Sequence, residues 1–339
     1  MMRDPLHRGG RVVKRILVLI IVAALAAAGA GYWWLHQPIV AGDKPVELEV
    51  EPGMAPRAVA QAVQSAGMQV NGDLLYWWFR LSGQDRKIRA GNYEIPAGTT
   101  PQSLLARLVR GEESQRVLTI VDGWTFRQVR AALAKEESLK HDSAAMAPAD
   151  IMAALGKPGV AAEGRFYPDT YAFAKGSSDL ALLARAMQAM DKRLDVAWSL
   201  KPADSPLKTP EDLLTLASIV EKETGKAADR GLVAGVFVNR LRIGMLLQTD
   251  PTVIYGLGEK FDGNLRKRDL QTDTPWNTYT RAGLPPTPIA MPGKAALMAA
   301  VQPASTKALY FVAKGDGSSH FSESLDEHNR AVNQYQRGR

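Results

Sequence analysis

An uncharged run of twenty residues, 16–35, constrains the fold of this chain more than any other feature. It has the sequence ILVLIIVAALAAAGAGYWWL. As a helix rising about 1.5 Å per residue it would be about 30 Å long, which matches the hydrocarbon core of a bilayer. Basic residues precede it at positions 3, 8, 11, 14 and 15, and three aromatic residues close it. We therefore predict a cytoplasmic basic tail over 1–15 and a transmembrane helix over 16–35, with the rest of the chain outside the cytoplasm.

A cleaved signal peptide is the alternative, because the small residues at 28–30 resemble a cleavage site. The apolar run is longer than a signal core of about 7–15 residues, which favours the anchor.

The formal net charge of +7 is partly explained by the basic tail. No basic stripe interleaved with aromatic residues is present, so we expect no nucleic-acid partner. The chain has no cysteine, which excludes disulfides, thiolate metal sites and a cysteine nucleophile.

The exported part is predicted to have an α+β fold. A linker over 36–45 leads to a region over 46–115 in which a strand, a turn and a helix follow one another twice. In the second pass Tyr93 and Ile95 form the strand, and Thr100 caps a helix whose first residue is Pro101. This pattern resembles the LysM module, a small peptidoglycan-binding fold. An intermediate α+β region over 116–205 follows, and then a mixed α/β domain over 206–339.

A helix predicted over 210–224 carries two glutamates of interest. Thr209 caps it, Pro210 begins it, Asp212 stands at the capping-box position and Gly225 ends it. At 100° per residue, Glu221 lies about 80° to one side of the apolar face and Glu223 about 80° to the other. The two therefore cannot act as a carboxylate pair on one bond. Either alone, half buried, would have a raised pKa suited to a general acid.

Periodicity does not choose between the two glutamates. The purely structural alternative is that both are boundary residues that form surface ion pairs, for example with Lys226 or Arg230.

A Ser218–Lys222 nucleophile is disfavoured because Lys222 points away from the apolar face, where nothing would lower its pKa. His320 and His328 have no third ligand nearby and are expected to pin the C-terminal strand and helix. With no glycine-rich phosphate loop either, we expect no metal and no cofactor.

Several motifs resemble one family. LASIVEKETG, VFVNRLRIGMLLQTDPTVIYGLG, NTYTRAGLPPTPIAMPG, HFSESLDEHN and the upstream EGRFYPDTY are similar to the MltG (YceG-like) family of membrane-anchored endolytic murein transglycosylases. Thr287 and Met291 depart from the family pattern, where glycine and asparagine are expected. The departures concern the proline loop that carries Pro285, Pro286 and Pro288.

The resemblance implies a lyase that cuts the MurNAc–GlcNAc β-1,4 bond of nascent glycan without water and leaves 1,6-anhydro ends. It selects Glu221 as the catalytic acid and then base. It also implies a location at the inner membrane, with the catalytic part in the periplasm, glycan strands as substrate and peptidoglycan synthases as further partners. Polar or aromatic loop residues are candidates for substrate binding, with turn or core roles as the alternative: Asn239, Arg240, Gln248, Thr249, Asp250, Tyr255, Asn277 and Tyr279.

Two other functions compete with this hypothesis. A non-catalytic scaffold would bind peptidoglycan and recruit synthases through the LysM-like region and the membrane helix. A hydrolysing muramidase would need a second carboxylate or a held water, and the motifs offer Asp250 for that role.

Overall fold

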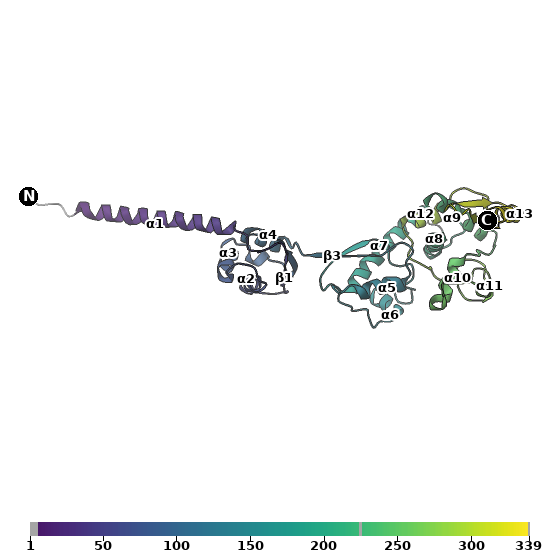
Figure 1. Ribbon diagram of the computed structural model, residues 1–339, viewed down its shortest axis with the longest axis horizontal. Coiled ribbons are helices and arrows are strands. Elements are labelled where there is room, and N and C mark those ends of the chain that lie inside the picture. Colours follow the sequence, from purple (N-terminus) through teal and green to yellow (C-terminus); the bar gives the residue numbers. More distant parts are fainter. Residues whose placement is uncertain (1–5, 224–225, 338–339) are drawn as a thin grey trace, which may run out of the picture. The chain divides into compact units, whose positions relative to one another are not determined.

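The computed structural model describes residues 6–223 and 226–337 of the chain (Figure 1). The chain divides into two compact units, residues 1–115 and residues 116–339. Both units mix helices with short two-stranded sheets, as the α+β prediction requires. Of the predicted basic tail, residues 1–5 lie outside the described residues.

The first helix, α1, runs over Leu6–Leu35 and so begins earlier than predicted. Its segment Lys14–Leu35 is long and apolar enough to cross a membrane, and none of it is buried. It is the one such helix among the described residues. Its last turn contacts the first unit, because Trp34 packs against that unit's buried core.

Besides α1, the described part of the first unit contains two antiparallel strands and three α-helices. Strand β1 (Val46–Val50) pairs with β2 (Gly91–Ile95), with Leu48 opposite Tyr93. Helices α2 (Pro56–Ser65) and α4 (Pro101–Arg110) follow the strands as predicted, and Thr100 caps α4 through a capping box. Helix α3 (Gly72–Leu81) and the 3₁₀ turn η1 (Asp85–Lys87) lie between them in the chain, and the sequence analysis singled out neither.

The N-terminal part of the second unit surrounds its own buried cluster. Strand β3 (Gln115–Thr119) forms a two-stranded sheet with β4 (Thr170–Ala174). Helices α5 (Phe126–Lys135), α6 (Pro148–Ala154) and α7 (Asp179–Ser199) contribute the cluster's apolar side chains. The motif EGRFYPDTY begins at residue 163, and strand β4 covers only its last part.

The C-terminal part is built around a buried helix, α8 (Pro210–Glu223). Thr209 and Asp212 cap it reciprocally through side-chain bonds to each other's backbone N–H, as predicted. Helices α9 (Ala227–Arg242) and α12 (Lys294–Val301) pack on it, and its eight residues 213–220 are all buried. Gly225, which we predicted to end this helix, lies outside the described residues.

Shorter elements complete the second unit. They are α10 (Asp250–Leu257), η2 (Gly258–Lys260), α11 (Lys267–Gln271), β5 (Tyr310–Ala313), β6 (Ser319–Ser322), α13 (Leu325–Val332) and η3 (Asn333–Arg337). Each of the two buried clusters of this unit includes a side chain from the other part of the unit. Tyr167 belongs to the cluster around α8, whereas Met291 from the proline loop belongs to the cluster around α5. The structure therefore groups the predicted regions 116–205 and 206–339 in one compact unit.

Candidate functional site

Glu221 lies in the last turn of α8 with its side chain only 9% exposed. Its carboxylate accepts a hydrogen bond of 2.9 Å from the N–H of Gly293, the residue that caps α12. The guanidinium of Arg230, on α9, stands 3.9 Å from the same carboxylate. One buried carboxyl therefore has a backbone donor on one side and a partly exposed cation on the other.

The segment 122–124 pairs with the segment 291–293 beside the Glu221 carboxylate. Gly123 donates its N–H to the Met291 carbonyl at 2.8 Å, and Met291 donates to the Trp124 carbonyl at 2.7 Å. This pairing brings Asp122 against Gly293, where an added Cβ would lie 2.3 Å from a carboxylate oxygen of Asp122. A side chain at position 293 would therefore displace the Asp122 carboxylate. Since the Gly293 N–H also contacts Glu221, the carboxyl groups of Asp122 and Glu221 are within about 8 Å of each other.

These neighbours set the protonation of Glu221. Burial raises its pKa above the ordinary range, because the charged form loses water, and the negative charge of Asp122 raises it further. The Gly293 N–H, Arg230 and Lys222 oppose this by stabilising the carboxylate. The net direction is upward, so Glu221 is suited to hold a proton and give it up within a site.

Glu223 faces a different environment, as the helical periodicity predicted. Its carboxylate accepts a hydrogen bond from the hydroxyl of Thr249, which is 1% exposed. Burial raises the pKa of Glu223, and the nearby Asp250 adds to the rise while Thr249 and Arg240 lower it. The two glutamates of α8 thus have separate partners, and they do not share a site.

Three of the predicted substrate-binding residues are engaged in holding the backbone. Asn239 donates to the carbonyls of residues 306 and 308 at 2.8 and 3.1 Å. Arg240, which is 7% exposed, donates to the carbonyls of residues 309 and 247 at 2.7 and 2.6 Å. Asn277 is fully buried and donates to three carbonyls at the end of α11, residues 269, 270 and 272. Asn239 and Arg240 thus hold the chain before β5 and the chain at 247 against α9, and Asn277 holds its own loop against the end of α11.

The segment 248–250 is tied to 277–279 and carries the other predicted residues. The N–H of Thr249 binds the Thr278 hydroxyl at 3.1 Å, and the Tyr279 hydroxyl donates to the Asp250 carboxylate at 2.5 Å. Gln248 is exposed and has a positive φ of 48°, the one such non-glycine residue among those described. A strained, exposed polar residue of this kind is typical of binding loops.

Two cavities of about 810 and 610 Å³ share a wall made by Arg127, Glu163, Tyr255 and Trp276. Lys222, the neighbour of Glu221 in sequence, lines the smaller one. Trp276 stands edge to face with Tyr255 at 5.6 Å, and both are partly buried. An aromatic wall beside a polar rim is the usual form of a small-molecule or sugar site.

Glu163 is another buried carboxyl group, and it lines both cavities. It accepts a 2.9 Å hydrogen bond from the N–H of Phe126, at the start of α5. Burial raises its pKa to about 7, against the lowering effect of that bond and of the Tyr255 hydroxyl.

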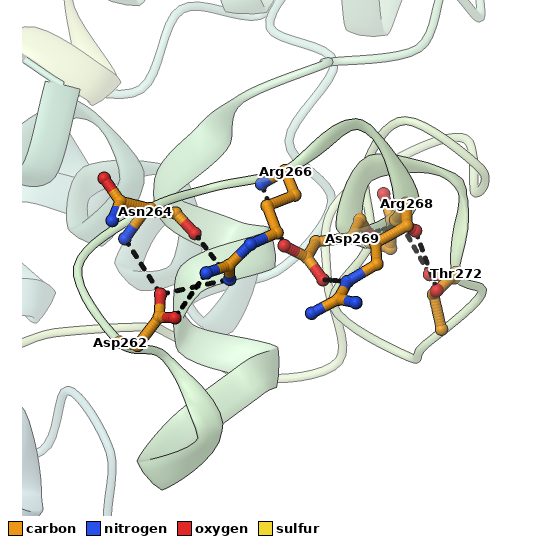
Figure 2. A network of polar contacts seen from close by, with 7 residues as sticks. Asp262, Asn264, Arg266, Arg268, Asp269 and Thr272 are labelled. Carbon is orange, nitrogen blue, oxygen red and sulfur yellow. Dashed lines mark hydrogen bonds and ion pairs between the residues drawn. The ribbon is translucent and has the colours of Figure 1, made fainter.

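The loop that carries Phe261, another wall residue of the smaller cavity, is held by a network of charged side chains (Figure 2). Arg266 binds both oxygens of Asp262 at 3.1 and 2.5 Å, and Asp269 accepts the backbone N–H of Arg266 at 2.8 Å. The guanidinium lowers the pKa of Asp262. These charges are exposed and screened by solvent, so the network shapes the loop more than it stabilises the fold.

Comparisons with known proteins fit this arrangement. The model of the YceG-like family matches residues 48–334. The chain belongs to the YceG-like family. An endolytic murein transglycosylase of Bacillus subtilis (strain 168) is 30% identical over 307 residues, covering 86% of this chain and 84% of that protein. One of Streptococcus pneumoniae (strain R6) is 29% identical over 329 residues, covering 87% of this chain and 59% of that protein. The 2.6 Å crystal structure of a YceG-like protein from Listeria monocytogenes has a TM-score of 0.54 and 28% identity, covering 85% of this chain and 98% of that one.

Thr287 and Met291, which are expected to depart from the family pattern, each have a structural role. The Thr287 hydroxyl accepts the indole N–H of Trp276 at 3.0 Å and so fixes the aromatic wall. Met291 is fully buried in the cluster around α5. A glycine at 287 would lose the contact to Trp276, and an asparagine at 291 would need polar partners in this cluster.

Sequence reasoning assigned no role to several residues at this candidate site. Asp122, Arg127, Glu163 and Trp276 had none, although Glu163 begins the EGRFYPDTY motif. Their place at the site depends on chain segments that are far apart in sequence.

Other residues weighed at the sequence level have structural roles. The Ser218 hydroxyl is buried, donates to the Thr215 carbonyl and accepts the Ile289 N–H, which is incompatible with a nucleophile. His328 stacks on Tyr310 at 5.2 Å, and His320 lies beside Tyr335 at 5.7 Å. Within the described part of the chain, no group of three or more potential metal ligands comes together.

Proposed function

We propose that this chain is an endolytic murein transglycosylase. It would cleave the MurNAc–GlcNAc β-1,4 bond of nascent peptidoglycan without water, leave 1,6-anhydroMurNAc ends and so terminate glycan elongation. Membership of the YceG-like family and the names of two relatives support the reaction class. The observation that carries the residue assignment is Glu221: one largely buried carboxyl with a raised pKa beside a backbone N–H, in a helix whose next residue, Lys222, lines an aromatic-walled cavity.

The proposed reaction needs only one carboxyl group. Protonated Glu221 gives its proton to the glycosidic oxygen as the bond to C1 breaks through an oxocarbenium-like state. The resulting carboxylate then takes the proton of the C6 hydroxyl of the same muramoyl sugar, whose oxygen bonds to C1 and closes the anhydro ring. The group ends protonated, ready for the next cycle. General acid–base catalysis of this kind contributes about 10²–10⁴-fold.

The proposed substrate contacts divide into two groups. Gln248, Asp250, Tyr255 and Tyr279 are exposed or partly exposed, and we place them against sugar hydroxyl and acetamido groups, with Trp276 extending the wall. Thr249, Asn239, Arg240 and Asn277 have side chains already bonded to the fold, and we assign them to holding the loops that carry the first group.

The proposed location follows from α1 and its basic flank. Helix α1 would cross the inner membrane once with the N-terminus in the cytoplasm, which leaves the rest of the first unit and all of the second in the periplasm. The first unit would bind glycan as a LysM-like module, a role that its strand–helix alternation supports. Peptidoglycan synthases are the partners proposed for this location.

The test uses the full chain in detergent with un-crosslinked peptidoglycan in ¹⁸O-labelled water, with products identified by mass spectrometry. We expect products one water lighter than hydrolytic muropeptides and free of ¹⁸O. Glu221→Gln should form these products about 10²–10⁴-fold more slowly, while Glu211→Gln, which changes an exposed glutamate of the same helix, should behave as the unchanged chain. If the unchanged chain is folded but leaves the glycan intact, the scaffold hypothesis replaces this one.

A hydrolysing muramidase remains the second candidate, and one observation favours it. Asp122 is exposed and lies within about 8 Å of Glu221, a range that includes the separations used by two-carboxylate glycosidases. Asp122 is therefore the candidate second carboxylate in place of Asp250, because Asp250 binds Tyr279 beside Glu223. Products that contain ¹⁸O, and their loss in Asp122→Asn, would establish the hydrolase.

A further inference from the structure

Helix α3 of the first unit carries an exposed stripe of large apolar side chains. Leu74, Trp77 and Leu81 are 55%, 59% and 81% exposed. The other face of the same helix is used in folding, because Leu75 and Phe79 are fully buried in the unit's core. The helix therefore has two apolar faces, and only one of them is covered.

The exposed residues form one face by helical geometry. At 100° per residue, Leu74 and Leu81 lie about 20° apart and Trp77 about 40° further round. Asp73 and Arg80 border the stripe on one side, and both are already paired, Asp73 with Arg57 at 2.8 Å and Arg80 with Asp85 at 3.0 Å. The border charges are thus neutralised locally, and the stripe offers an apolar surface that polar groups do not interrupt.

The same unit is fastened to the end of α1. Trp34, one residue before α1 ends, packs against the unit's core, and Ile39 is already buried and hydrogen-bonded to the Thr99 carbonyl at 2.8 Å. Only residues 36–38 separate the helix from the buried chain, so the connection has little slack. Within this unit α3 lies at the end where α1 arrives, whereas β1 lies toward the other end (Figure 1). The exposed aromatic residues Tyr32 and Trp33 mark the membrane–water boundary that α1 would have at this end.

We propose that α3 is an interfacial helix that lies on the outer surface of the membrane crossed by α1, with Leu74, Trp77 and Leu81 among the lipid headgroups and upper acyl chains. This inference rests on the proposed membrane anchoring. We choose a phospholipid surface as the partner of the stripe, because the short connection over 36–38 holds the first unit close to the membrane that α1 would cross. A helix whose apolar face is flanked by charges is the usual form of such a contact. The contact fixes the first unit at the membrane and confines the enzyme to glycan close to it.

Because the border charges are paired within the chain, apolar burial would supply the binding. Insertion should therefore be independent of the anionic lipid content of the outer leaflet. This separates the proposed contact from a basic patch attracted to acidic lipids.

The absence of cysteine allows a direct test by single-cysteine labelling. Nitroxide labels are placed at Leu25→Cys in α1, at Leu81→Cys in α3, and at Glu49→Cys, an exposed position on β1, in the full chain reconstituted into phosphatidylcholine vesicles. Accessibility to oxygen, which dissolves in lipid, is compared with accessibility to a water-soluble nickel complex. Thermal melting of each labelled variant shows that it is folded.

We expect the labels at 25 and 81 to be reached by oxygen in preference to nickel, and the label at 49 to be reached by nickel. The same result is expected with and without anionic lipid. A label at 25 in lipid with a label at 81 in water would overturn the inference and leave the anchor in place. A label at 25 in water would remove the anchoring proposal and this inference with it. A label at 81 shielded from both reagents would indicate a protein partner or a second copy of the chain, and would also overturn it.

Discussion

The pH dependence of cleavage should respond in opposite directions to two charge changes beside Glu221. Arg230 lowers the pKa of Glu221 and Asp122 raises it. If Glu221 must be protonated in the free enzyme, kcat/KM falls as pH rises through its pKa. Arg230→Gln should therefore move this alkaline limb to higher pH, and Asp122→Asn should move it to lower pH.

The size of the first shift follows from the structure. The Arg230 and Glu221 groups are 3.9 Å apart, with side chains 18% and 9% exposed. Unit charges at about 4 Å interact by about 1 kcal/mol in water and about 4 kcal/mol at an effective dielectric of about 20. Because Arg230 keeps contact with solvent, we place the interaction near the lower value. Since one pKa unit corresponds to about 1.4 kcal/mol, the limb should move by about one pH unit.

The assay is kcat/KM against pH on un-crosslinked glycan, with the full chain in detergent. Arg57→Gln serves as the control, because it removes the same charge from an exposed ion pair in the other unit. The alkaline limb of the Arg57→Gln profile should lie at the same pH as that of the unchanged chain. The reasoning fails if Arg230→Gln leaves the limb in place, or if both substitutions beside Glu221 move it in the same direction.

Three further predictions concern the surroundings of the site. The folded-state pKa of Glu163, about 7, exceeds the ordinary 4.5 of a glutamate, so the unfolded chain binds fewer protons between these values and stability falls as pH rises. Glu163→Gln should remove about 3 kcal/mol of this fall, so the difference in unfolding free energy between the variant and the unchanged chain should vary with pH. A difference that is the same at all pH values would refute the prediction. Arg240→Ala should destabilise the fold by about 3–5 kcal/mol in the same denaturation measurement, because it leaves buried carbonyls without a donor. Trp276→Ala should raise KM about tenfold, or about 1.4 kcal/mol, with a smaller effect on kcat in steady-state cleavage assays; an effect on kcat alone would argue against a binding wall.

Local sequence signals predicted α8 well. Thr209, Pro210 and Asp212 act within one turn of the helix start, and the apolar period places Glu221 and Glu223 on opposite borders. The strand and cap at β1 and α4 follow for the same reason, since their determinants are adjacent in sequence. The apolar run of α1 needs only length and composition.

Long-range pairing could not be predicted in this way. Asp122 reaches Glu221 only because Gly123 bonds to Met291, far along the chain, and no periodicity encodes that contact. The role of a polar loop residue is also ambiguous from sequence, because a side-chain amide can hydrogen-bond either a sugar or a backbone carbonyl. Asn277 was predicted to bind substrate, and the structure shows its side chain bonded to three carbonyls of the fold.

The choice of Glu221 over Glu223 is the central claim, and one comparison tests it most directly. Initial rates of glycan cleavage are measured for Glu221→Gln and Glu223→Gln in the full chain, with melting temperatures to show that both are folded. Glu221→Gln should lose about 10²–10⁴-fold in rate, while Glu223→Gln, which keeps an acceptor for Thr249, should stay within about tenfold of the unchanged chain. A Glu221→Gln variant that cleaves nearly as fast as the unchanged chain, or a folded Glu223→Gln variant that loses as much rate, would contradict the account.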